Sequence, residues 1–314
     1  MKTIHLDPIL HAYHLSGAQV THQTESLHTA YHIQHPSGNH IVKRLTFPPD
    51  DTQHQKLTLS CRLMAHLHTQ GFPCPNPLIN QQGHFVTEYN GQHYQAFTVI
   101  PGQPDWNTIT PNRIQQTGEL LGKFHRLQQT FPDMPPPVDL QDRIKMGMQR
   151  IIAEWETYPI TRNDIRLAAH EALSNIHTLW SPLQTLPTGL MHTDATPGNV
   201  FFHGEHLTGL IDFEVIPGAF LLDLCMAALR WADAFDPTTQ MNHLDTNKLK
   251  QFLTAYNNTR PLNPLETDAL KNSLLLAAIW SWSRQRPHRA NDPAFRLTSR
   301  GDIVLAVQNL NLSG

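Results

Sequence analysis

The hydrophobic pattern of the chain changes its period near residue 102, and this change restricts the possible folds more than any other feature. Before Pro101 and Gly102, apolar residues gather in short runs or alternate with polar ones, as in β-strands. After them, apolar residues recur at every third or fourth position, as on one face of a helix. The pattern predicts an α+β protein, with a β-rich part at residues 1–102 and a mostly helical part at residues 103–314.

The β-rich part is predicted to contain five strands and one helix. The helix is expected at residues 53–69, where leucines fall on one face and Gly71 then ends it. Asn90-Gly91 is a typical two-residue hairpin turn. The expected strands lie at residues 18–22, 27–34, 40–46, 84–88 and 93–100.

The second part is predicted to be a set of packed helices. One begins at Pro111 after Thr110, because proline suits the first helical position and threonine suits the cap. His125 in that helix is expected to be a packed or hydrogen-bonded core residue. Further apolar faces predict helices around residues 144–155, 165–180, 248–256, 265–284 and 298–310.

Residues 190–214 interrupt the helical part with a predicted β-hairpin. Two short apolar runs flank a turn at residues 203–205. Asp194 and Asn199 precede the hairpin on a loop that a Pro-Gly pair keeps from being helical, and Asp212 closes its second strand. Two carboxylates and a carboxamide are therefore expected near one end of a rigid hairpin.

These residue types suit phosphoryl transfer. That reaction needs a carboxylate that orients a hydroxyl group, and oxygen ligands that hold Mg²⁺ against a polyphosphate. Asp194 can serve as the base, and Asn199 and Asp212 can serve as the metal ligands. The alternative is that the segment is an ordinary turn whose side chains cap the backbone.

The pattern His192-x-Asp194-x4-Asn199, followed by residues 210–214 (Leu-Ile-Asp-Phe-Glu), resembles the aminoglycoside-phosphotransferase and choline-kinase-like superfamily, relatives of protein kinases. The resemblance implies a two-lobed protein-kinase-like fold, with a small antiparallel sheet in the first lobe. It implies ATP as the donor, Mg²⁺ as the metal and a small-molecule hydroxyl as the acceptor. Asp194 then becomes the catalytic base, and Asn199 and Asp212 become the metal ligands. His192 is expected to brace the loop, and Asp223 to hold it from behind.

The resemblance also suggests where the nucleotide binds. Residues 41–45 are similar to the strand whose lysine contacts the phosphates, which makes Lys43 a predicted ATP-binding residue; the alternative is a solvent-facing charge on a strand. The phosphate-covering loop is expected near residues 23–30 and has no glycine, so Ser26 and backbone amides would approach the phosphates. Phe97 and Val99 lie where the superfamily binds adenine through main-chain groups.

One departure from the superfamily concerns the partner of the lysine. Residues 53–70 contain no acidic side chain, so the usual helix glutamate is missing. Lys43 is therefore expected to be held by the nucleotide or by the metal-binding carboxylate. The same departure leaves open a non-catalytic nucleotide-binding pseudokinase or scaffold.

The acceptor is predicted less sharply. Residues 70–77 and 256–266 are similar to the bacterial homoserine-kinase-like branch, so homoserine or a similar amino alcohol is the leading candidate. An aminoglycoside, an amino sugar or another sugar is the alternative. The residues expected to wall a substrate cleft are Arg230, Arg284, Arg286, Trp231, Trp280 and Trp282. Of these, the three arginines favour an amino-acid substrate, whose carboxylate they could bind.

The composition of the chain excludes several other classes of function. Charged residues make up only 16% and the formal net charge is -3, so there is no basic surface to indicate a nucleic-acid partner. The 21 histidines lack the spacing of a zinc site. Three widely spaced cysteines suit reduced thiols, and neither a signal peptide nor a membrane span is expected. We expect a cytoplasmic enzyme without a membrane partner, and make no prediction of its oligomeric state.

Overall fold

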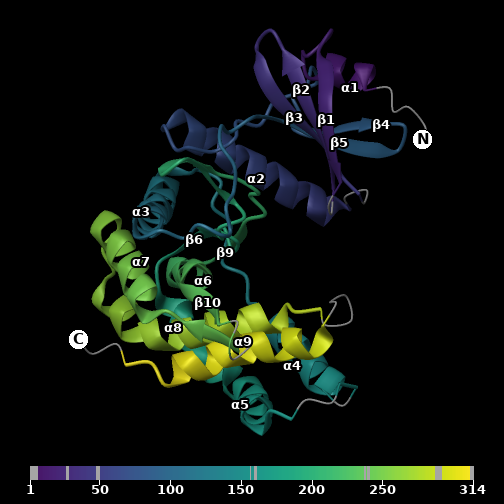
Figure 1. Cartoon of the computed structure of the whole chain (residues 1–314). Coiled ribbons are helices and arrows are strands. Elements are labelled where there is room, and N and C mark those ends of the chain that lie inside the picture. Colours follow the sequence, from purple (N-terminus) through teal and green to yellow (C-terminus); the bar gives the residue numbers. More distant parts are fainter. Residues whose placement is uncertain are drawn as a thin grey trace. The chain divides into compact units, whose positions relative to one another are not determined.

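The computed structural model of the chain describes residues 6–25, 28–46, 50–155, 157–158, 161–236, 238, 241–286 and 292–311. These residues divide into two compact units (Figure 1). The first contains the described residues of Met1–Pro104 together with Asn199–Val215. The second contains those of Asp105–Gly198 and Ile216–Gly314.

The first unit is built on a five-stranded antiparallel sheet, as predicted. Its strand order is β1-β2-β3-β5-β4. The turn between β4 and β5 places Asn90 at φ 52° and Gly91 at φ 70°, and two positive φ angles in succession are typical of a type I′ hairpin turn. The strands are β1 (Gln19–Glu25), β2 (Thr29–His35), β3 (Gly38–Arg44), β4 (Thr87–Tyr89) and β5 (Gln92–Thr98).

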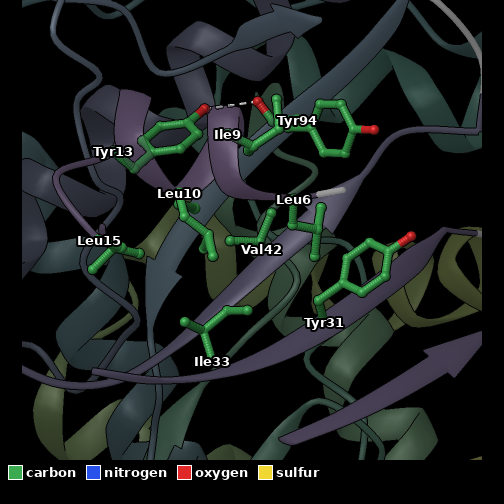
Figure 2. Close-up of a cluster of buried hydrophobic side chains, with 10 residues drawn as sticks. Leu6, Ile9, Leu10, Tyr13, Leu15, Tyr31, Ile33, Val42 and Tyr94 are labelled. Carbon is green, nitrogen blue, oxygen red and sulfur yellow. Dashed lines mark hydrogen bonds between the residues drawn. The ribbon is translucent and has the colours of Figure 1, made fainter. Parts of the chain in front are cut away.

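A short helix that the sequence did not predict closes one side of this sheet. Helix α1 (Asp7–Ala12) contributes Ile9 and Leu10 to a buried cluster with side chains of β2, β3 and β5 (Figure 2). The hydroxyl of Tyr13, just after the helix, donates a hydrogen bond to the carbonyl oxygen of Tyr94 at 2.7 Å. Six residues are fewer than two helical turns, so no period of 3.6 can be detected in their sequence.

Helix α2 (Asp51–Thr69) and the predicted hairpin complete the first unit. Asp50 caps α2 by accepting a hydrogen bond from the amide of Gln53 at 2.7 Å. The hairpin consists of β7 (Val200–His203) and β8 (His206–Leu210). It joins the rest of the unit through main-chain bonds, among them Leu210 N to Pro73 O at 2.9 Å.

The contact between the hairpin and the segment after β5 requires a glycine at position 102. Gly102 has a φ of 92°, and a Cβ atom there would overlap the carbonyl group of Phe202 in β7. Gln103, the next residue, exchanges two main-chain hydrogen bonds of 3.1 Å with Phe202. The Pro-Gly break after β5 therefore has a packing role, because only glycine allows the two backbones to come this close.

The second unit is mainly helical, and each predicted helix is present. Thr110 caps α3, whose first residue is Pro111, as expected. Helix α6 is almost completely buried and packs against α7 and α8, while α8 also packs against α9. The helices are α3 (Pro111–Leu127), α4 (Gln141–Trp155), α5 (Asn163–Trp180), α6 (Phe220–Ala232), α7 (Thr246–Thr259), α8 (Pro264–Ser283) and α9 (Pro293–Gln308), with 3₁₀ turns at Gln128–Thr130 and Ser181–Thr185.

Two small sheets in this unit were not predicted. Strand β6 (Thr188–Met191) pairs with β9 (Ile216–Ala219), and β10 (Asp233–Asp236) pairs with β11 (Met241–Leu244), both antiparallel. Each strand has only four residues, which is too short for an alternating pattern to stand out. Among the described residues, no helix combines the length and apolar character needed to cross a bilayer.

Candidate active site

Asp194 lies on a tightly held loop in the second unit. This segment, residues 192–198, is called the Asp194 loop. The Asp194 side chain is exposed, whereas His192 is buried, and the Nδ1 atom of His192 accepts the Asp194 amide at 3.3 Å. Trp231 Nε1 donates to the carbonyl oxygen of Ala195 at 2.9 Å. The loop thus presents one carboxylate on a fixed backbone, and His192 braces it as predicted.

Thr193 shows that the loop backbone is under strain. Its φ is 62°, a value that a β-branched residue adopts only when its surroundings impose it. The constraint comes from Asp223 in α6, whose side chain is 1% exposed. The two carboxylate oxygens of Asp223 accept the amides of His192 and Thr193, each at 2.7 Å. The expectation that Asp223 holds the loop from behind is confirmed.

A buried hydrogen-bond network extends behind Asp223. His125 Nε2 lies 3.0 Å from Asp223 Oδ2, and His125 Nδ1 lies 2.7 Å from the hydroxyl of Tyr256. Arg260 then donates to the Tyr256 hydroxyl at 3.1 Å and to Glu266 at 2.9 Å. His125 is a hydrogen-bonded core residue, as expected. Tyr256, Arg260 and Glu266 belong to one of the two segments similar to homoserine kinases, and here they support the loop from the interior.

The protonation states in this network follow from burial and from the partners. Burial lowers the pKa of His125, so the ring is neutral near pH 7. Burial alone would raise the pKa of Asp223, but the hydrogen bonds from the His125 ring and from the backbone amide of His192 hold that pKa below its usual value. An ionised Asp223 can only accept hydrogen bonds, so His125 carries its proton on Nε2 and accepts the Tyr256 hydroxyl on Nδ1.

A cavity of about 200 Å³ opens beside Asp194 within the second unit. We call it the Asp194 pocket. Three of the six residues predicted to wall a substrate cleft line it: Arg230, Trp280 and Arg284. Trp231 and Trp282 are instead buried in the core, 1% and 0% exposed, and Arg286 is not part of the lining. The complete lining is Thr193, Asp194, Met226, Leu229, Arg230, Ala277, Ala278, Trp280, Ser281, Arg284, Gln285, Arg300 and Ile303.

Three residues of this region were missed at the sequence level. Asp233 forms an ion pair with Arg230, three positions earlier at the end of α6, and that spacing was a usable signal. Arg300 also pairs with Asp233, and Trp106 lies under the Arg230 guanidinium at 5.5 Å. Both are too far from Arg230 in sequence for any local pattern to connect them.

In the first unit, Lys43 of β3 meets Asp212. The distance from Lys43 Nζ to Asp212 Oδ1 is 3.5 Å, with the two side chains 24% and 45% exposed. This pairing agrees with the expectation that Asp212, the predicted metal ligand, is one of the groups that hold Lys43 where the helix glutamate is missing. Asp212 has a φ of 62°, so this backbone is strained as well.

Helix α2 presents the thiol of Cys61 near Lys43 and carries no acidic side chain at residues 53–69. Gln95, the cross-strand neighbour of Lys43, donates its side-chain amide to Cys61 Sγ at 3.3 Å. Burial raises the pKa of the Cys61 thiol to about 12, against a smaller opposing effect of the Lys43 charge. Cys61 is therefore neutral and cannot form an ion pair with Lys43.

Asn199 and Asp212 lie at the same end of the hairpin. The register pairs Val200 with Leu210, and the next main-chain bond runs from Ile211 N to Asn199 O at 2.9 Å. The two side chains offer an amide oxygen and a carboxylate oxygen. No group of three or more His, Cys, Asp or Glu residues suited to a metal occurs in the described part of the chain. An Asn-Asp set fits Mg²⁺, which takes few protein ligands and completes its shell with phosphate oxygens and water.

The remaining predicted nucleotide-binding residues are placed only in part. Ser26 lies outside the described residues. Phe97 belongs to β5, opposite Ile41 of β3. Val99 follows β5 with 37% of its surface exposed, and its amide donates to the carbonyl oxygen of Asn39 at 3.2 Å. ATP binding by these residues stays a prediction.

Comparisons with known proteins agree with this architecture. A model of the phosphotransferase enzyme family matches residues 23–262. A homoserine kinase of Rhodopseudomonas palustris (strain BisA53) is 32% identical over 212 residues, which cover 66% of this chain and 61% of that kinase, less than two thirds of its length. A homoserine kinase of Bartonella tribocorum is 29% identical over 246 residues, covering 74% of this chain and 72% of the relative.

Solved structures show the same fold at low identity. The amicoumacin kinase hAmiN, in complex with AMP-PNP and Ca²⁺, has a TM-score of 0.66 at 14% identity and covers 95% of this chain and 92% of its own. An aminoglycoside phosphotransferase of Alicyclobacillus acidocaldarius has a TM-score of 0.63 at 16% identity, with 92% and 90% covered. A choline kinase of Cryptosporidium parvum has a TM-score of 0.60 at 13% identity, with 93% and 89% covered. The predicted kinase-like α+β fold is confirmed.

Proposed function

Since the chain belongs to the phosphotransferase enzyme family, we propose that it transfers the γ-phosphoryl group of ATP to the hydroxyl group of a small molecule, with Mg²⁺ as the metal. The observation that carries the proposal is the exposed carboxylate of Asp194 at the edge of a small pocket. Its loop has a strained backbone at Thr193 and is held by the buried Asp223. Strain of this kind persists where a functional geometry requires it. The similarity to homoserine kinases makes homoserine, or a similar amino alcohol, the proposed acceptor.

Each site residue receives one task in this proposal. Asp194 orients the acceptor hydroxyl and takes up its proton as the bond to phosphorus forms. Lys43 binds phosphate oxygens of ATP. Asn199 and Asp212 hold Mg²⁺, which when bound neutralises charge on the phosphate oxygens. Ser26, Phe97 and Val99 complete the nucleotide site.

The proposed domain organisation assigns a nucleotide-binding lobe to residues 1–102 and a substrate lobe to residues 103–314. The hairpin that carries Asn199 and Asp212 packs within the first unit, which supports a role for it on the nucleotide side. We place the protein in the cytoplasm, where reducing conditions keep thiols free, because Cys61, Cys74 and Cys225 are buried and unpaired.

The lack of an acidic side chain at residues 53–70, together with the neutral Cys61 thiol near Lys43, favours a second candidate function, a pseudokinase that binds nucleotide without turnover. The two candidates differ in their need for Asp194. A pseudokinase has no use for a hydroxyl-orienting base, whereas a kinase that loses it should slow by about 100- to 10,000-fold.

The test measures ADP formation with Mg²⁺-ATP and a panel of acceptors containing L-homoserine, amino alcohols, sugars and aminoglycosides. The wild type is compared with Asp194→Asn and Asp212→Asn. We expect acceptor-dependent ADP release that requires Mg²⁺ and is lost in both variants. ADP release that no acceptor stimulates, or that persists unchanged in Asp194→Asn, would refute the proposed function.

A further inference from the structure

The geometry of the Asp194 pocket points to a carboxylate on the acceptor, and we infer that Arg284 is the residue that binds it. The inference rests on the proposed kinase function and specifies its substrate class: a small hydroxy acid or hydroxy amino acid. The argument follows from the charges, partners and size of the pocket, all within the second unit.

The first step is that two of the three pocket arginines already have a carboxylate partner. Arg300 Nη1 lies 2.6 Å from Asp233 Oδ2, and Arg230 Nη1 lies 3.5 Å from the same oxygen. The other Asp233 oxygen accepts the side-chain amide of Asn242 at 2.8 Å. Asp233 is 13% exposed, so this shared ion pair is shielded from solvent and fixes both guanidinium groups. Asp233 is thus a positioning residue.

The second step is that Arg284 has no such partner. It follows the last turn of α8 and its side chain is exposed. In the part of the chain that the structure describes, no acidic side chain forms an ion pair with it. Among the lining residues and Asp233, one positive charge remains after both carboxylates, Asp194 and Asp233, are counted. A guanidinium that lines a pocket and forms no ion pair within the described part of the chain is suited to bind a carboxylate of the ligand, because its planar donors match both carboxylate oxygens.

The third step is size. A volume of about 200 Å³ lies below the roughly 300–1,000 Å³ of pockets for drug-sized ligands. Several walls are aliphatic (Met226, Leu229, Ala277, Ala278 and Ile303), which suits a short methylene chain between two polar ends. A multi-ring aminoglycoside does not match this volume, and its positive charges would meet an excess of positive charge.

The experiment uses two acceptors that differ only in the carboxylate. L-Homoserine and 3-aminopropan-1-ol share the hydroxyl, the amine and the carbon chain between them. Steady-state kcat and KM are measured with both for the wild type, Arg284→Gln and Arg284→Lys. Arg286→Gln is the matched control, since Arg286 is an exposed arginine two positions away that does not line the pocket.

We expect the wild type to prefer homoserine, and Arg284→Gln to lower kcat/KM for homoserine by about 10- to 100-fold, mainly through KM. Activity on 3-aminopropan-1-ol should change less than about threefold. A merely structural role would instead lower the activity on both acceptors equally. Arg284→Lys should recover part of the loss, because it keeps the charge but not the planar fork. Arg286→Gln should behave as the wild type.

Two results would overturn the inference while leaving the kinase function intact: equal use of both acceptors by the wild type, or equal losses on both in Arg284→Gln. If no acceptor is phosphorylated, the proposed function fails, and calorimetric binding of the two acceptors without ATP still decides the inference. Homoserine binding that Arg284→Gln weakens would support it. Homoserine binding unchanged by that substitution, or no preference for homoserine over 3-aminopropan-1-ol, would contradict it.

Discussion

Replacing Asp223 with asparagine tests how the Asp194 loop is held. The aspartate accepts two backbone amides at 2.7 Å and the ring of His125 at 3.0 Å, using both oxygens. Asparagine has nearly the same shape but only one acceptor oxygen. In either orientation of its amide, one of the amides of His192 and Thr193 faces an NH₂ group. Asp223→Asn therefore leaves a buried donor without an acceptor.

The size of the expected effect follows from the loss of this one hydrogen bond. A buried, unsatisfied backbone amide costs about 1–3 kcal/mol, and hydrogen bonds to a charged acceptor are about twice as strong as neutral ones. We expect Asp223→Asn to lower the free energy of unfolding by about 3 kcal/mol, which corresponds to a decrease in Tm of about 6–12 °C for a unit of this size. The strained φ of 62° at Thr193 should then relax and displace Asp194, which is expected to lower kcat by about 100-fold.

Tyr256→Phe is the matched control. It removes the hydroxyl that contacts His125 Nδ1 and accepts from Arg260, but leaves all three hydrogen bonds to Asp223 in place. We expect a loss of about 1 kcal/mol, a Tm lower by about 2–4 °C, and kcat within about threefold of the wild type. Thermal unfolding by circular dichroism and steady-state kinetics give both quantities. Equal effects of the two variants on Tm and kcat would refute the reasoning that Asp223 acts through the loop amides.

Three further predictions concern other parts of the molecule. Lys43→Ala should raise KM for ATP by about 10- to 100-fold. It should change Tm by less than about 2 °C, because its ion pair with Asp212 is long, at 3.5 Å, and partly exposed to solvent. A large Tm change with normal ATP kinetics would contradict this. Gly118→Ala should lower the free energy of unfolding in urea by about 1–3 kcal/mol, because the added Cβ would lie 2.6 Å from the Phe252 carbonyl oxygen. At a helix position with open space, the same change from glycine to alanine would instead stabilise the protein by about 1 kcal/mol. Burial lowers the pKa of His125, so below about pH 6.5 the unfolded chain binds a proton at this residue that the folded chain does not. The free energy of unfolding should therefore fall with decreasing pH, by up to about 1.4 kcal/mol per pH unit from this residue. A Tm that is constant from pH 7.5 to 5.5 would contradict this prediction.

The fold was predictable wherever the sequence carries a local signal. Thr110 and Pro111 predicted the start of α3, and Asn90-Gly91 predicted the β4–β5 turn. Helix α1 and the small β10–β11 sheet were missed because six or four residues contain too little of any period. Their stability comes from tertiary contacts, such as the packing of Ile9 against the sheet, which local propensity does not encode.

The candidate site was predictable as a set of chemical groups but not as an arrangement. The hairpin brought Asn199 and Asp212 to one end because its turn fixes its register. The contact between His125 and Asp223 spans 98 positions, and the pairing of Arg300 with Asp233 spans 67. No spacing rule reaches so far, so the network behind the loop and the charge balance of the pocket required the structure.

The most direct test of the central claim, that Asp194 serves phosphoryl transfer from ATP to a hydroxyl group, is a single-turnover measurement. Enzyme in excess over labelled ATP is mixed with Mg²⁺ and L-homoserine, and the phosphorylated product is identified by mass spectrometry over time. The wild type should convert the label into a phosphate ester of homoserine, and Asp194→Asn should do so at least about 100-fold more slowly while still binding ATP. An equal rate of ester formation in the two proteins would contradict the account.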